Sequence, residues 1–123
     1  LAAAEQKAAN RLTEAERKAV VKRAAQMLAE KTAHFAKEMG VTYGRITIRE
    51  QKTRWGSCSS AGNLNYNWKL VLMPERVMDY VVIHELAHRK EMNHSARFYA
   101  VVAQQMPDYK VWQSWLKEHG REY

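Results

Sequence analysis

YVVIHELAH, residues 80–88, joins an apolar run to the pattern HExxH. On a helix, side chains four residues apart lie about 40° from each other and roughly 6 Å along the axis. His84 and His88 can therefore converge on one metal ion. Glu85 lies about 100° round the helix, where it can flank the metal and accept a proton from a metal-bound water. The alternative is a helix that carries two histidines and a surface glutamate, because the pattern also occurs by chance.

A third ligand is needed, since a catalytic zinc site takes three protein ligands and keeps one position open. His94 is the leading candidate, because three of the five histidines fall within residues 84–94. In an unbroken helix His94 would lie about 15 Å beyond His84, so the chain has to turn back. We expect the break at Asn93, because Asn tolerates left-handed backbone angles. Glu91 is the rival ligand, but its position predicts a side chain that points outward.

One helix and two strands are expected before this motif. The segment TEAE, residues 13–16, matches a capping box, and apolar residues at helical spacing continue to Gly40, a typical C-terminal glycine. The residues before Thr13 are also helix formers, so an earlier start is open. Polar and apolar residues alternate in residues 45–49 and 63–68, which predicts two half-buried strands. We expect residues 52–62, rich in Gly and Ser, to be the loop of a long hairpin.

Three helices are expected after the strands. Pro74 suits the first turn of the HExxH helix, which we expect to run to about Met92. Ser95 can cap a second helix that ends at Pro107, and a last short helix precedes Gly120. The fold class is therefore α+β: an N-terminal helix, a small antiparallel hairpin or sheet, the HExxH helix and two further helices. The 123 residues fit a single domain, residues 1–123.

Composition bears on the cellular compartment and the partners of the protein. A single cysteine, Cys58, cannot form an internal disulfide and suits a reducing compartment. No apolar stretch approaches the roughly 20 residues that cross a bilayer, and the N-terminus has no apolar signal core. We therefore expect a cytoplasmic protein with no membrane partner. The net charge of +7 keeps nucleic acid as a candidate partner, although no run of five like charges is present.

Further motifs surround the HExxH segment. They are TRWGSCS at 53–59, Asn63-Leu64-Asn65, Trp68-Lys69-Leu70, Pro74, DYVVIHELAH at 79–88 and Asn93-His94-Ser95. In this order they resemble the YgjP-like metal-dependent hydrolases, which are zincin-type metallopeptidase domains related to the SprT and WLM families. The resemblance covers about residues 40–116.

This resemblance implies a zincin-like peptidase fold with one Zn²⁺. His84, His88 and His94 would be its ligands, and Glu85 the catalytic base. Family members often carry further strands before the first helix. The chain, which starts at Leu1, is thus a candidate fragment that lacks N-terminal strands.

Other polar residues are candidates for contacts to the substrate or the transition state. These are Tyr99, Tyr80, Arg97 and Asn65, with Tyr66 as a further hydroxyl donor. In zincins a strand beside the active-site helix can pair with an extended substrate, and residues 63–68 are our candidate, with an ordinary hairpin strand as the alternative.

The segment 54–58 is expected to border the cleft. Within it, Trp55 is expected to pack in the core and Arg54 to pair with a carboxylate such as Asp79. We expect Cys58 to be a buried thiol or a residue just outside the ligands rather than a fourth ligand, because it is distant in sequence and a catalytic site keeps one position open.

Three functions follow from these features. The leading hypothesis is a zinc metallopeptidase that cleaves peptide bonds in peptides or proteins. The second is a basic, SprT-like module that associates with nucleic acid and binds or processes proteins there. The third is a zinc-stabilised domain without turnover, against which Glu85 weighs, because a structural site needs no base.

Overall fold

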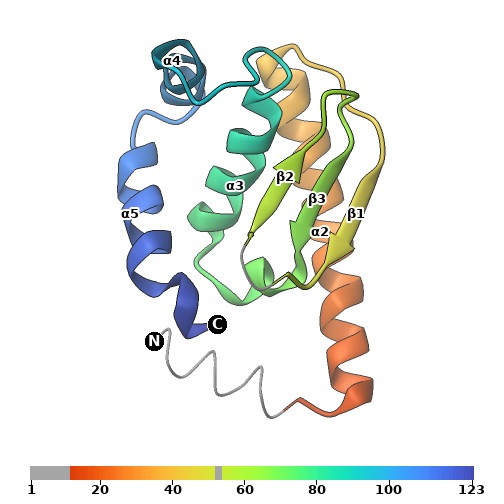
Figure 1. Ribbon diagram of the computed structural model, residues 1–123. Coiled ribbons are helices and arrows are strands. Elements are labelled where there is room, and N and C mark those ends of the chain that lie inside the picture. Colours follow the sequence, from red (N-terminus) through yellow and green to blue (C-terminus); the bar gives the residue numbers. More distant parts are fainter. Residues whose placement is uncertain (1–11, 52–53) are drawn as a thin grey trace.

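A computed structural model describes residues 12–51 and 54–123, and its order of elements is that of an α+β domain (Figure 1). Helices and strands follow in the order α2 (Glu14–Met39), β1 (Ile46–Arg49), β2 (Gly56–Cys58), β3 (Leu64–Asn67), the 3-10 helix η1 (Trp68–Leu72), α3 (Glu75–Ala87), α4 (Ala96–Gln105), α5 (Tyr109–His119) and the 3-10 helix η2 (Gly120–Glu122). The predicted fold class is confirmed. No helix in the described parts of the chain is long and apolar enough to span a membrane.

Helix α2 begins and ends where the sequence predicted. The Thr13 side chain accepts a hydrogen bond from the Glu16 amide, and the Glu16 carboxylate accepts one from the Thr13 amide. At the other end Gly40 adopts a left-handed conformation with φ of 71°, which glycine reaches without a steric penalty. An earlier start of the helix would fall in residues 1–11, outside the described residues.

The sheet has three strands in the order β1-β3-β2, and its topology corrects the predicted hairpin. Strand β3 pairs parallel with β1 and antiparallel with β2. The hairpin therefore joins β2 to β3, and β2 lies inside the segment that was expected to be a loop. The sequence Gly-Ser-Cys of β2 carries no alternating apolar pattern. Pairing with β3 and packing against α3 make it a strand.

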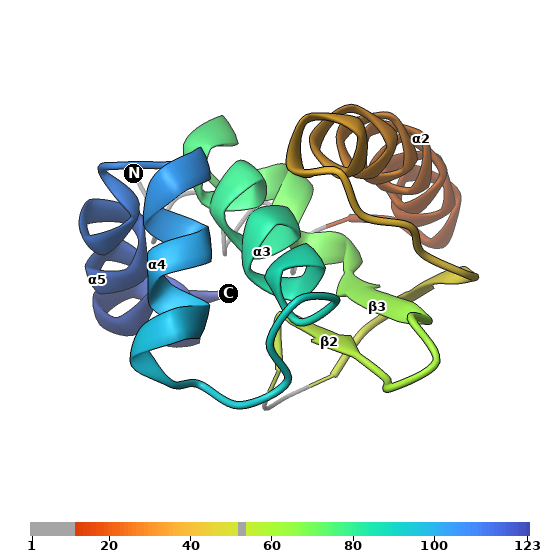
Figure 2. The same ribbon diagram turned by 90° about the horizontal axis from the view of Figure 1, so that it is seen from above.

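Helix α3 is the centre of the molecule. Seen from above, α2 and α3 cover one face of the sheet, and α4 and α5 lie on the side of α3 away from α2 (Figure 2). Ten of the thirteen residues of α3 are buried, so neighbours hold this helix on nearly every side. A helix held in this way presents its functional side chains from a rigid backbone.

Candidate metal centre

The chain reverses direction directly after α3, earlier than predicted. The helix ends at Ala87, and His88 already belongs to the turn, with φ of −64° and ψ of −15°. The expected end at Met92 and the left-handed break at Asn93 are wrong, since none of the described non-glycine residues has a positive φ. Tight right-handed turns make the reversal instead, with the amides of Lys90 and Glu91 both donating to the Ala87 carbonyl.

Arg89 fixes this reversal to the rest of the fold. Its side chain donates from Nε to the Thr42 carbonyl at 2.8 Å and from Nη1 to the Ser60 carbonyl at 3.1 Å. Gly62 makes room for it, because a Cβ at this position would lie 2.7 Å from the Arg89 Cζ. The next helix, α4, starts as predicted, with Ser95 Oγ accepting a hydrogen bond from the Phe98 amide.

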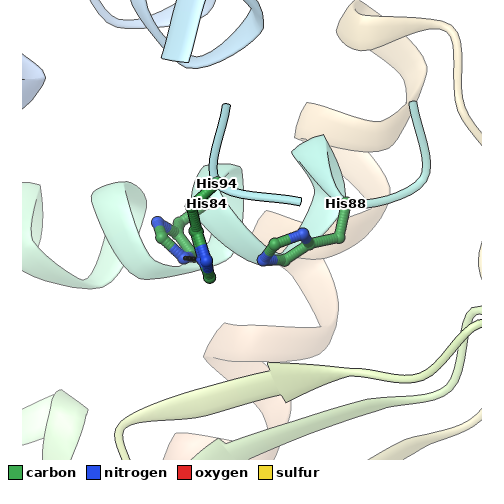
Figure 3. Close-up of side chains that lie close together, drawn as sticks. All are labelled: His84, His88 and His94. Atoms are coloured by element: carbon green, nitrogen blue, oxygen red, sulfur yellow. Dashed lines mark hydrogen bonds between the residues drawn. The ribbon is translucent and has the colours of Figure 1, made fainter. Parts of the chain in front are cut away.

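The reversal brings the three predicted histidines together (Figure 3). His84 lies on α3, His88 at its end and His94 in the loop before α4. The Nε2 atoms of His84 and His94 are 3.2 Å apart, and one ligand atom from each of the three residues lies within 4.8 Å of the others. The requirement that the chain turn back before His94 is met.

The Nδ1 atoms of His84 and His88 have partners of their own. His88 Nδ1 lies 3.1 Å from the backbone carbonyl of Glu91, and His84 Nδ1 lies 3.4 Å from the Tyr80 hydroxyl. Such contacts fix the tautomer of a metal-binding histidine and leave Nε2 for the ion. Glu91 thus takes part through its backbone carbonyl.

Phe98, in the first turn of α4, contacts all three histidines. Its ring stacks on His88, with centroids 4.5 Å apart, and meets His84 and His94 edge-on at 4.9 and 5.0 Å. Phe98 is fully buried, so its position is set by the core. One core residue therefore couples the packing of the domain to the geometry of the site.

Burial also sets the charges at the site. It lowers the pKa of His84 to about 4, with further lowering from His88 and His94, and it lowers the pKa of His88. Neutral imidazole is the form that binds metal. Burial raises the pKa of Glu85 to about 8, which the nearby Arg54 charge opposes. A cation within about 4–6 Å favours an ionised carboxylate, so a metal held by the histidines would restore the basic form of Glu85.

The donor set fits a zinc ion. Two nitrogens on one tetrahedral zinc, each bound at about 2.0–2.1 Å, are separated by roughly 3.3 Å. The 3.2 Å between the Nε2 atoms of His84 and His94 matches this separation. Three neutral imidazoles also suit zinc among the divalent metals, and they leave a coordination position open.

A cleft of about 410 Å³ lies between the histidines and β2, and the predicted border segment 54–58 contributes to it. Its lining comprises Arg54, Gly56, Ser57, Cys58, His84, Glu85, His88, Met92 and His94. Gly56 allows β2 to approach α3, because a Cβ there would lie 3.1 Å from both Glu85 Cγ and Val81 Cγ1. The Cys58 thiol is half-buried in this lining, donates to the Ser59 carbonyl and lies outside the ligand cluster.

The remaining candidate contact residues lie away from this lining. The Tyr80 hydroxyl lies against His84 Nδ1, and Tyr99 packs between His94 and Tyr109. Arg97 is exposed on α4.

Two more candidates belong to the sheet. Asn65 bridges Arg49 and Ser57 through its side-chain amide, and Tyr66 is buried with its hydroxyl on Thr32. The expected substrate strand at residues 63–68 is wrong, because β3 is paired on both edges. The strand that lines the cleft is β2, which is paired on one edge only within the described sheet.

Two predictions about the border segment need correction. Arg54 does not pair with Asp79, which binds Lys31 at 2.6 Å and Arg76 at 3.5 Å. Trp55 packs against the core as predicted, but only in part. The contact of Phe98 with the three histidines was not predicted, because it depends on how α4 packs against α3.

Comparison with known proteins agrees with this picture. The family model described as "YgjP-like, metallopeptidase domain" matches residues 1–119. Comparison with the curated proteins found no match.

Two solved structures are similar in fold. The metallopeptidase zymogen of Pyrococcus abyssi abylysin aligns with a TM-score of 0.67 and 24% identity, over 76% of this chain and 96% of that one. The metallopeptidase zymogen of Methanocaldococcus jannaschii jannalysin aligns with a TM-score of 0.55 and 20% identity, over 68% of this chain and 90% of that one.

Proposed function

Because the chain belongs to the YgjP-like metallopeptidase family, we propose that it hydrolyses peptide bonds with one zinc ion held by His84, His88 and His94, and with Glu85 as general base. Its substrates are peptides or proteins. When bound, zinc supplies Lewis-acid polarisation of the attacked carbonyl and of water.

The isolation of Glu85 is the observation that carries this proposal. The residue is 6% exposed and lines the cleft beside His84 and His88, yet its carboxylate has no hydrogen bond or ion pair within the described residues. A buried carboxylate that serves stability is normally paired, since burial of an unpaired charge is costly. Glu85 is therefore free to take a proton from the attacking water and to pass it to the leaving amine.

Arg54 is the group best placed to meet negative charge in the cleft. Arg54 lines the same cleft, its guanidinium forms no hydrogen bond or ion pair with any described residue, and its charge lowers the pKa of Glu85 against the effect of burial. A positive charge there would stabilise the oxygen that gains charge as the carbonyl is attacked.

Arg54→Gln is expected to lower kcat by roughly tenfold to hundredfold, because a preorganised positive charge acts mainly on the transition state. The unfolding midpoint should stay close to that of the wild type, since Arg54 is exposed. Steady-state kinetics with a peptide substrate measure this change. Arg97→Gln, which changes an exposed arginine outside the cleft lining, is the matched control. A kcat for Arg54→Gln equal to that of the control would remove Arg54 from the mechanism.

Metal removal tests the proposed function as a whole. Dialysis against a chelator should reduce hydrolysis of an unfolded protein such as casein to background, and one equivalent of zinc should restore it. Cleavage is followed by gel electrophoresis and mass spectrometry. Equal cleavage by the zinc-loaded and the chelated protein would contradict a metal-dependent mechanism.

A further inference from the structure

A second, smaller hollow opens beside the metal cleft on the side of α5. It measures about 170 Å³, and four of its seven lining residues are aromatic or aliphatic: Trp55, Tyr80, Val81 and Leu116. We call this space the α5 hollow. Three residues, Gly56, His84 and Glu85, line both this hollow and the metal cleft. The two spaces therefore meet at the proposed general base.

The walls of the α5 hollow are held in place by the fold. Trp55 lies against the backbone of Gly120, where a Cβ would come within 3.1 Å of the indole Nε1, and its carbonyl accepts a hydrogen bond from the Asn67 amide at 2.9 Å. Tyr80 and Val81 are buried on α3, and Leu116 is half-buried on α5. A hollow with such walls is preformed, so little conformational entropy is lost when a ligand binds in it.

The α5 hollow is mainly apolar, although His84 and Glu85, which it shares with the metal cleft, add polar groups to its lining. The Tyr80 hydroxyl lies next to His84 Nδ1, so its polar atom has a partner within the protein. The metal cleft is different, since Arg54, Ser57 and His94 add polar groups to its lining. An apolar side chain at the site is thus better accommodated on the α5 side.

The size of the hollow sets the class of side chain. A cavity of about 150 Å³ lined by apolar residues accommodates benzene, and the α5 hollow, at about 170 Å³, exceeds it. Side chains such as Leu, Met or Phe therefore fit. Consecutive Cα atoms are about 3.8 Å apart, so a residue next to a peptide bond positioned at Glu85 can reach this space.

We propose that the α5 hollow receives a large apolar side chain of the substrate, from the residue adjacent to the bond that is cut. The inference rests on the proposed function and adds the substrate class. Peptides with Leu, Met or Phe at this position should be cleaved about ten- to hundredfold more efficiently than peptides with Gly, as expected when such a side chain leaves water.

The test uses a set of peptides that differ only at one residue beside the cleaved bond, together with sequencing of the cut sites in casein. Leu116→Trp fills the hollow, and Leu116→Gln keeps the size of the wall but makes it polar. Val111→Trp places the same bulk on the same helix at an exposed position, and is the matched control. Circular dichroism confirms that each variant is folded.

A binding measurement separates this inference from the proposed function. Calorimetric titration of peptides into Glu85→Gln, alone and combined with each Leu116 substitution, reports binding without turnover. We expect the apolar peptides to bind at least about tenfold more tightly than the Gly peptide, and the Leu116 substitutions to remove this difference. The control should retain it.

The outcomes are distinct. Cleavage of casein at sites with no apolar residue at a fixed position beside the cut, or equal affinity for Leu and Gly peptides, would overturn the inference and leave the peptidase proposal standing. Absence of cleavage by the zinc-loaded protein, with the apolar preference in binding retained, would overturn the peptidase proposal alone. An unchanged preference in both Leu116 variants would assign the preference to another surface.

Discussion

Glu85→Gln is expected to lower peptide hydrolysis by roughly 10²–10⁴-fold, the usual contribution of a general base. Glutamine keeps the shape of the side chain but cannot take a proton from water. The three histidines are unchanged, so zinc should remain bound. Because the folded protein disfavours a charge at this buried position, the uncharged amide should not reduce the free energy of unfolding. Peptide cleavage rates and the zinc content of the purified variant measure the two effects.

The control for this experiment is Glu30→Gln, which makes the same chemical change at an exposed position on α2. It should retain both the activity and the zinc content of the wild type. Wild-type activity in Glu85→Gln would refute the assignment of Glu85 as the base. Loss of zinc together with activity would instead give Glu85 a role in holding the metal.

Phe98→Ala is expected to have the largest effect on stability, with a free energy of unfolding lower by about 3–5 kcal/mol. Phe98 is fully buried, so the substitution leaves a cavity. It also removes the ring that contacts His84, His88 and His94, and with it the packing that holds them together. Zinc affinity should therefore fall along with stability. Denaturant unfolding of the metal-free protein and zinc titration measure the two quantities separately.

Val102→Ala is the matched control, because Val102 is equally buried on the same helix but lies outside the cluster of rings around the histidines. It should reduce stability without changing zinc affinity. If Phe98→Ala also leaves zinc affinity unchanged, then Phe98 belongs to the core alone.

Features set by neighbours in the sequence were predicted well. The caps of α2 at Thr13 and Gly40, and that of α4 at Ser95, depend on side chains within three or four residues, and all three are confirmed. Strand β2 was missed, because three small or polar residues become a strand only through their pairing with β3. The early end of α3 was missed for a similar reason, since the turn after Ala87 is fixed by contacts of Arg89 with distant loops.

The candidate site divides in the same way. His84 lies on α3, and His88 caps this helix with right-handed helical backbone angles, so their local spacing sufficed to pair them. His94 can reach the other two histidines only if the chain turns back after α3. The sequence predicted this requirement, and the tertiary structure fulfils it. Arg54 was expected to border the cleft and does so, but its expected pairing with Asp79 was wrong. Phe98 reaches the histidines from α4, and no local pattern marks it. Cytoplasmic location and association with nucleic acid stay predictions.

Zinc binding by the histidine cluster is the central claim, and calorimetric titration of the metal-free protein tests it most directly. The wild type should bind one zinc ion per chain. In His94→Ala the zinc affinity should fall by more than about 100-fold. Loss of a group that only hydrogen-bonds a metal ligand costs roughly 10–100-fold, and loss of the ligand itself should cost more. His119→Ala, which changes a histidine on α5 paired with Glu122, should bind as the wild type does. Failure of the wild type to bind zinc, or equal affinity in His94→Ala, would contradict the account.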